Sequence, residues 1–258
     1  MNNKNSPCKI NLLVSGLALA TSAFACFHSK NSVQSNPPVT DEKIKSILFD
    51  AIKQDPQFLM DSMNEGMMRK REDAIKNLSS EISKRSTEIS KQSLQFGKLT
   101  SKVSLTCFFD PLCKHCIEFL KSMVKLIGSK KDACFKLIPV AVLGDDSFVL
   151  AKLFIAAYGK NPQKALSFID KITSLDGEMD KQIIEDALKF AGFDVAEIEK
   201  MLPDAEKSLA NNGALAESLG IPIVPAIFIS KNGMTSMLQA VELNQLLSEI
   251  EKGPEKIK

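Results

Sequence analysis

The sequence contains few cysteines, very few histidines and no apolar run that could cross a membrane. Six cysteines in 258 residues are too few for a fold that disulfides hold together. The two histidines and the one C-x-x-C pair make a four-ligand structural zinc site a weak alternative. The apolar stretch INLLVSGLALA, residues 10–20, is shorter than the roughly 20 residues that a membrane-spanning helix needs. These shortages argue against a disulfide scaffold, a zinc module and a membrane-spanning protein.

Charge of one sign is not in excess either. The chain has 33 basic and 31 acidic residues, and the numbers become equal without the first 25 residues, which contain two lysines and no acidic residue. A chain balanced in this way lacks the positive field that attracts a phosphate backbone, so we predict no nucleic-acid partner. With 44% hydrophobic residues, the chain can still bury a substantial core.

The N-terminus has the pattern of a targeting segment. Lys4 and Lys9 precede the apolar stretch, and Ala23-Phe24-Ala25 offers small residues for cleavage. We predict a signal peptide over residues 1–25 and a polar, proline-containing linker over residues 26–40. Cys26 would follow the cleavage site, so a lipid anchor on Cys26 and ordinary cleavage both remain open.

Residues 41–97 have a highly charged helical pattern, in which a narrow apolar seam alternates between steps of three and four. The seam consists of Ile75, Leu78, Ile82, Arg85, Ile89, Gln92 and Phe96. A seam this narrow needs a partner, which can be a second chain or the rest of this one. We predict self-association through this helical extension.

From residue 98 onwards the pattern is that of an α/β domain. KVSLTCFFD and CFKLIPVAVL read as covered strands on either side of a helix, which makes a parallel strand–helix–strand unit. Helical faces follow over about residues 147–219, and Asn232-Gly233 indicates a hairpin turn. A final helix is expected at 241–252. Cys107 and Cys134 fall on the two strands, where buried free thiols are favoured over a disulfide.

The motif Cys113-Lys114-His115-Cys116 stands where the first strand meets the helix. A disulfide that closes only four residues constrains little chain entropy, so a purely structural bond is the weaker interpretation. At a helix N-terminus, unpaired N–H groups and the macrodipole favour an anionic sulfur at Cys113, and Lys114 and His115 add to this effect. Cys116, one turn into the helix, should be less exposed. The motif therefore indicates a redox centre.

A proline that opens a strand beside such a helix is often cis. The candidate is Val224-Pro225, and Ile221-Pro222 competes with it.

The order of these motifs over residues 98–252 resembles the thioredoxin fold in its DsbA-like form, and FFDPLCKHC resembles that family's F-F-D-x-x-C-x-x-C. The resemblance implies a thioredoxin-like α/β fold with a helical insertion and a thiol–disulfide oxidoreductase without a cofactor other than its redox-active disulfide. It implies that Cys113 attacks, Cys116 resolves and His115 stabilises the thiolate. It also implies that Val224 and Pro225 align the substrate.

The helical extension is similar to that of the oligomeric relatives, such as ScsC-type proteins and the Com outer-membrane antigens. This resemblance implies a homo-oligomer in the periplasm or cell envelope of a bacterium, cysteine-containing client proteins, and a membrane redox partner of DsbB or DsbD type. Oxidase and isomerase activity both remain open. The alternative is a non-catalytic envelope protein or a Cu(I)-binding module, for which the candidate ligands are Met60, Met63, Met67 and Met68.

Overall fold

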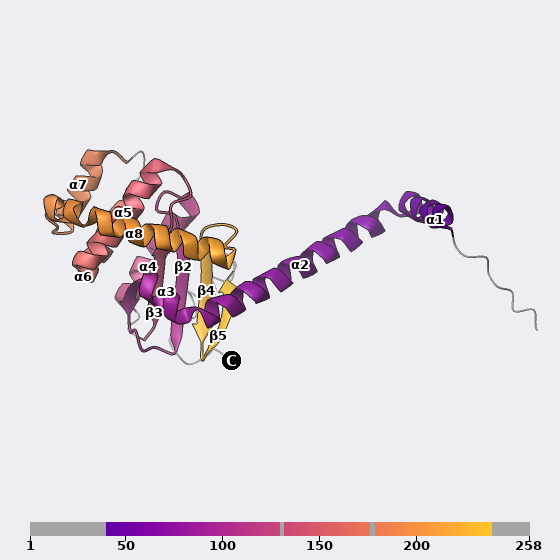
Figure 1. Ribbon diagram of the computed structural model, residues 1–258, viewed down its shortest axis with the longest axis horizontal. Helices are drawn as coiled ribbons and strands as arrows, with labels where there is room; N and C mark the ends of the chain where they lie inside the picture. The colour runs from indigo at the N-terminus through magenta and orange to yellow at the C-terminus, as the bar shows by residue number, and fades with distance from the viewer. Residues whose placement is uncertain (1–39, 130–131, 176–178, 239–258) are drawn as a thin grey trace, which may run out of the picture. The chain divides into compact units, whose positions relative to one another are not determined.

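The computed structural model describes residues 40–129, 132–175 and 179–238 (Figure 1). The expected signal peptide, the expected linker up to residue 39 and the final helix expected at 241–252 lie outside these residues. The chain divides into two compact units, residues 1–62 and 63–258. Within the described ranges, no helix has the length and apolar character needed to cross a membrane.

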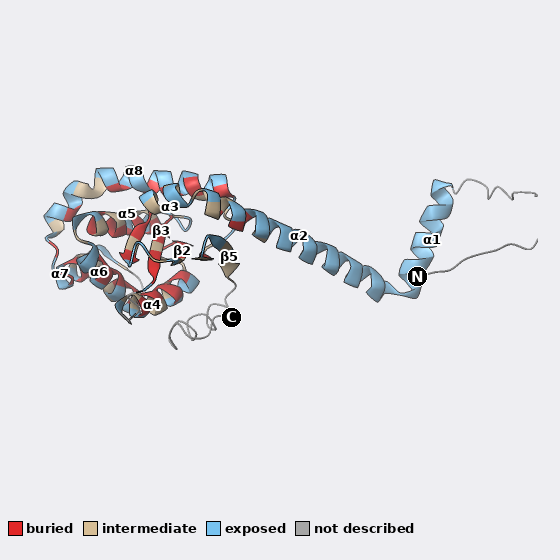
Figure 2. Cartoon of the chain, turned by 90° about the horizontal axis from the view of Figure 1, so that it is seen from below, coloured by how far each residue is buried: buried red, intermediate tan, exposed pale blue. Residues whose placement is uncertain are grey.

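Two helices begin the described chain. Helix α1 (Asp41–Gln54) starts after Thr40, whose side chain caps it. Helix α2 (Pro56–Lys84) starts after Asp55, whose carboxylate accepts a backbone hydrogen bond at 3.0 Å. Proline at the first helical position has no N–H to leave unpaired, which explains why a new helix begins at this point. All residues from 40 to 74 are exposed, as the pale blue of α1 and of most of α2 in Figure 2 shows.

The helical pattern expected to reach Phe96 ends earlier. After α2, helix α3 spans Ser86–Gln92, and Leu94–Gly97 form strand β1. Strand β1 pairs antiparallel with β3 (Cys134–Pro139), so the end of the expected extension belongs to the sheet. Gly97 has a φ of 78°, and a Cβ there would collide with a carbonyl oxygen just before β3. Only glycine fits this position.

The described strands form one mixed sheet of five, in the order β1-β3-β2-β4-β5. Strand β2 (Val103–Phe109) and β3 run parallel and are connected by α4 (Lys114–Ser129), which confirms the strand–helix–strand unit. Strands β4 (Ala226–Lys231) and β5 (Met234–Leu238) continue the sheet antiparallel. The turn at Asn232-Gly233 has φ values of 52° and 85°, which confirms the hairpin.

Four helices form the insertion expected at about 147–219. They are α5 (Asp145–Lys160), α6 (Pro162–Ser174), α7 (Lys181–Phe190) and α8 (Val195–Leu219). Asn161, Asp180 and Asp194 cap the starts of α6, α7 and α8 by accepting backbone hydrogen bonds, and these residue types are preferred at that position. The helical insertion is confirmed.

The hydrophobic core lies on both faces of the sheet, because successive residues of β2 point to opposite sides. Cys107 and Phe109 belong to a cluster with Cys116 and residues of α4 to α8. Phe108 belongs to the cluster on the other face. Figure 2 shows α8 above the strands and α4 and α6 below them. The fold is therefore a layered α/β fold, as expected.

The apolar seam of the expected extension has its partner in the same chain. Leu78, Ile82 and Ile89 are buried in one cluster with Phe108 and Leu215. A second chain is not what covers these three residues. The prediction of self-association therefore concerns the exposed positions 40–74 alone.

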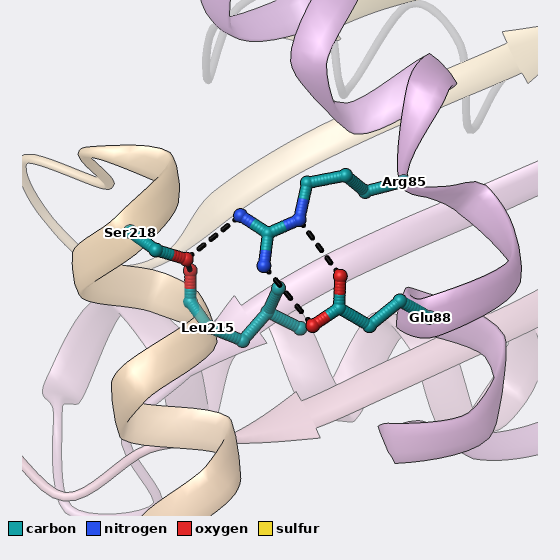
Figure 3. A network of polar contacts seen from close by, with 4 residues as sticks. All are labelled: Arg85, Glu88, Leu215 and Ser218. Carbon is teal, nitrogen blue, oxygen red and sulfur yellow. Dashed lines mark hydrogen bonds and ion pairs between the residues drawn. The ribbon is translucent and has the colours of Figure 1, made fainter.

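Arg85, a polar interruption of that seam, holds the junction of α2 and α3 against α8 (Figure 3). Its Nε and Nη2 donate hydrogen bonds to the carboxylate of Glu88 at 2.8 and 3.0 Å. Its Nη1 donates to Ser218 Oγ of α8 at 2.7 Å. The hydrogen bonds from Arg85 lower the pKa of the Glu88 carboxyl.

Candidate active site

The turn after β2 places Cys113 at the start of α4. Cys113 N donates a hydrogen bond to Asp110 O at 3.2 Å, and Cys113 O accepts one from Ile117 N at 2.9 Å. Cys113 is therefore the residue that caps the helix, and its side chain is half-buried. This is the position that the C-x-x-C motif predicts.

The two thiols of the motif differ in accessibility. Cys116 is completely buried, whereas Cys113 is not. Burial raises the pKa of the Cys116 thiol, and its interaction with Cys113 raises it further. Cys116 therefore stays a thiol in the folded, reduced protein at neutral pH, and a reagent in solution reaches Cys113 first.

A second segment, directly before strand β4, lies next to Cys113. The Val224–Pro225 peptide bond is cis, the isomer expected at this position rather than at Ile221–Pro222. Cys113 Sγ donates a weak hydrogen bond to Val224 O at 3.7 Å. The fold thus brings Val224 and Cys113 together, although 111 residues separate them.

His115 does not lie against Cys113. Its side chain is 83% exposed, and its Nδ1 lies 4.0 Å from Glu118 Oε2, one turn further along α4. The imidazole is therefore exposed to solvent, and its partner is the carboxylate of Glu118.

Asp110 lies next to the cysteine turn, and the sequence analysis gave it no role. Its side chain is completely buried. Oδ1 accepts from Leu112 N at 2.8 Å, and Oδ2 accepts from Val142 N at 2.7 Å, Leu143 N at 3.1 Å and Ser147 Oγ at 2.6 Å. The carboxylate thereby ties the cysteine turn to the start of α5. The signal that could have found it is an acidic residue directly at the end of an apolar strand, where burial requires partners.

Cys107 and Cys134 are free, buried thiols. In the parallel register, Cys107 lies opposite Leu137 and Cys134 lies opposite Ser104. The two cysteines are thus offset by three positions along adjacent strands, roughly 10 Å at the rise of a strand, which is too far for a disulfide. Burial raises the pKa of the Cys107 thiol, as do the neighbouring Cys116 and Cys113.

Solved structures share this arrangement of elements. One is the thiol-disulfide exchange protein alpha-DsbA2 from Wolbachia pipientis, with 22% identity, a TM-score of 0.58, and 67% of this chain and 95% of that chain covered. Another is a linker-deletion mutant of Proteus mirabilis ScsC, with 18% identity, a TM-score of 0.58, and 86% and 99% covered. A third is BcfH of Salmonella enterica Typhimurium, with 15% identity, a TM-score of 0.66, and 82% and 96% covered.

The chain has the DsbA-like thioredoxin fold. No protein-family model and no curated protein matches it, so the likeness concerns the fold, and activity has to be argued from the site. In this DsbA-like fold, the described residues contain no group of histidine, cysteine, aspartate or glutamate side chains that could hold a metal ion. The four methionines that the sequence analysis named as candidate Cu(I) ligands lie on α2, and the side chain of each is more than half exposed: Met60, Met63, Met67 and Met68.

Proposed function

We propose that the protein is an exported thiol–disulfide oxidoreductase that acts on cysteine-containing client proteins in the periplasm or cell envelope of a bacterium. The observation that carries the proposal is the unequal pair of thiols at the start of α4, with Cys113 accessible and Cys116 buried. Such a pair lets a client reach the sulfur of Cys113, while the sulfur of Cys116 stays inside the fold and is the group released by that attack.

The reaction is an exchange of two electrons. A client thiolate attacks Cys113 Sγ of the Cys113–Cys116 disulfide, which breaks that bond and releases Cys116, and Cys116 takes up a proton because burial keeps it a thiol. A second client thiolate then attacks the client sulfur of the mixed disulfide and releases Cys113. The client is oxidised to a disulfide and the protein is reduced to a dithiol. The redox centre needs no bound cofactor.

Other residues near Cys113 have supporting roles in this proposal. Because Cys113 Sγ reaches Val224 O, a client joined to Cys113 would lie with its backbone along Val224 and Pro225. The resemblance assigns His115, two positions after Cys113, the role of stabilising the thiolate, and we keep that role as part of the proposal.

The experiment that tests the proposal compares serine variants of the cysteines in insulin reduction and in oxidation of a reduced client. Cys113→Ser should abolish both activities. Cys134→Ser, which changes a buried thiol on β3 away from the pair, should retain them. Turnover by the Cys113→Ser variant would refute the assignment.

The reduction potential separates the two modes of action that the family resemblance leaves open. Equilibration with glutathione buffers, followed by thiol trapping, measures the Cys113–Cys116 pair. A reduction potential of about −120 mV indicates a donor of disulfides with a DsbB-type partner. A potential of about −180 to −230 mV favours disulfide reshuffling with a DsbD-type reductant. A pair that never equilibrates would be a structural bridge.

We also propose that the chain forms a homo-oligomer through α1 and the first part of α2. The apolar face of α1 is exposed: Ile44 by 44%, Ile47 by 57% and Leu48 by 56%. A helix with such a face needs a partner. Leu48→Glu should lower the mass measured by light scattering, whereas Lys45→Glu, also exposed on α1, should not. Mass spectrometry of the exported protein would show whether Cys26 carries a lipid.

A further inference from the structure

A small polar pocket lies between the sheet and the junction of α2 and α3, on the opposite face of the sheet from Cys107 and Cys116. Its volume is about 110 Å³, well below the roughly 300 Å³ at which sites for drug-sized molecules begin. A single water molecule needs about 10–15 Å³, so the pocket has room for only a few heavy atoms. Six side chains with hydroxyl groups line this hydroxyl pocket: Ser83, Ser86, Ser104, Thr106, Ser230 and Thr235.

Four adjacent strands supply the floor of the hydroxyl pocket. Thr106 of β2 lies opposite Lys136 of β3. Ser104 of β2 lies opposite Ser230 of β4, which in turn lies opposite Thr235 of β5. Further along β2 the same face of the sheet is buried in an apolar cluster. Because a sheet face that helices cover is normally apolar, a floor of hydroxyl groups and one ammonium group requires a polar occupant.

The hydroxyl of Thr106 has no protein partner. The residue is only 3% exposed, and within the described residues its side chain forms no hydrogen bond. Other hydroxyls of the pocket are paired: Ser230 and Thr235 share a hydrogen bond of 2.7 Å, and Ser83 donates to Gly233 O at 3.3 Å. Leaving a buried hydroxyl unpaired is costly, so we expect the group that binds Thr106 to occupy the pocket.

The charge of the hydroxyl pocket has one sign. Its only charged lining residue is Lys136, which is half-buried and forms no ion pair in the described part of the chain. An ammonium group donates hydrogen bonds only, and a hydroxyl can donate one. Ile82 and Ile89, which are 2% and 1% exposed, form the apolar wall, and a wall of this kind strengthens the attraction between charges. The pocket therefore favours an anion and repels a cation.

We propose that the hydroxyl pocket binds a small tetrahedral oxyanion of the phosphate or sulfate type. Lys136 would pair with its charge, and the hydroxyl of Thr106 would donate a hydrogen bond to one of its oxygens. Ser83 and Ser86 line the same pocket from α2 and α3. The bound anion would therefore join the base of the helical extension to the sheet. This site involves neither thiol of the redox centre, so it is independent of the proposed oxidoreductase function.

The test measures binding of inorganic phosphate and of sulfate to the full-length protein by isothermal titration calorimetry. Chloride keeps the ionic strength constant, so that screening of surface charges does not change during the titration. We expect one anion per chain. Hydrogen exchange followed by mass spectrometry should show slower exchange in α3 when phosphate is present, because the anion would hold this helix to the sheet.

Matched variants locate the binding. Lys136→Gln removes the ammonium group, and Thr106→Val replaces the hydroxyl by a methyl group. Each should weaken phosphate binding at least about tenfold, because a hydrogen bond to a charged acceptor is lost. Lys91→Gln removes an exposed charge of α3, and Thr173→Val removes a buried hydroxyl that donates to Asp170 O. Both controls should bind phosphate as the wild type does.

A second measurement separates loss of binding from loss of folding. In chloride, the Tm of Thr106→Val should be no lower than that of the wild type, since its methyl group replaces a hydroxyl that has no protein partner. In phosphate, the Tm of the wild type should rise and that of Thr106→Val should stay unchanged. A rise of the same size in both proteins would contradict the proposal.

Two other results would overturn the proposal. If the wild type binds neither phosphate nor sulfate, the pocket holds water alone. If Lys91→Gln weakens binding as much as Lys136→Gln does, the affinity reflects overall charge. Vesicles distinguish the source of the oxyanion when binding is found. Displacement of inorganic phosphate by vesicles of phosphatidylglycerol assigns the site to a lipid headgroup, and absence of displacement assigns it to the free anion.

Discussion

Replacing Asp110 by asparagine tests how the cysteine turn is held. The completely buried carboxylate accepts four hydrogen bonds, three at Oδ2 and one at Oδ1. An amide retains one oxygen. If that oxygen takes the place of Oδ2, the amide NH₂ faces Leu112 N–H, so one donor meets another and a buried hydrogen bond is lost.

The size of the effect follows from these contacts. An unpaired buried donor costs about 1–3 kcal/mol, and each hydrogen bond to a neutral acceptor is weaker than one to a charged acceptor by roughly 0.5–1 kcal/mol. For one lost and three weakened bonds, Asp110→Asn should lower the free energy of unfolding by about 3–5 kcal/mol. Ser147→Ala removes only the 2.6 Å bond to Oδ2 and should lower it by about 1–2 kcal/mol.

Urea unfolding of the reduced proteins, followed by circular dichroism and linear extrapolation, measures these values. Asp146→Asn is the control, because Asp146 is exposed in the same turn of α5, and it should change stability by no more than about 0.5 kcal/mol. The double variant should lose less than the sum of the single losses, because both changes act on the hydrogen bond between Ser147 and Asp110, which one of them weakens and the other removes. A loss below about 1 kcal/mol for Asp110→Asn, or strictly additive losses, would refute this account of the turn.

Three further predictions concern accessibility, pH and packing. Iodoacetamide should modify Cys113 in the folded, reduced protein and reach Cys116 only after unfolding, as peptide mass mapping would show; equal labelling of both would contradict the burial of Cys116. Burial raises the pKa of folded Cys116, whereas the thiol of the unfolded chain releases its proton at about pH 8.5. The contribution of the Cys116 thiol to the free energy of unfolding is therefore complete below that pH and is lost progressively as the pH rises above it. The free energy of unfolding of the reduced protein should therefore fall, relative to that of Cys116→Ser, by up to about 1.4 kcal/mol per pH unit between pH 9 and 10; parallel curves would exclude the effect. Ile82→Ala should lower stability by about 2–4 kcal/mol, since Ile82 is 2% exposed, whereas Met67→Ala, at 57% exposure, should stay within about 0.5 kcal/mol in the same urea assay.

The elements with a strong local signal could be predicted from the sequence. The apolar strands around the cysteine motif, the capped helices of the insertion and the Asn232-Gly233 turn all carry residue patterns with a period or a backbone requirement of their own. The place of Cys113 at the start of α4 and the cis bond at Val224–Pro225 follow from such signals too. Strand β1 could not be predicted, because four residues are too short to display a period of two after a long helical pattern.

The partners of these elements were decided by the tertiary structure. Ile82 and Ile89 fit a seam between two chains as well as the cluster in which they are buried, since an apolar stripe does not specify what covers it. Asp110 contacts residues 32, 33 and 37 positions later, and the cavity of about 1060 Å³ next to Leu112 and Lys114 is lined by residues of several separate helices. By itself the sequence therefore determined which residues can perform thiol chemistry and on which elements they stand. Burial, charge partners and open space arise only when distant segments meet, so they belong to the folded structure.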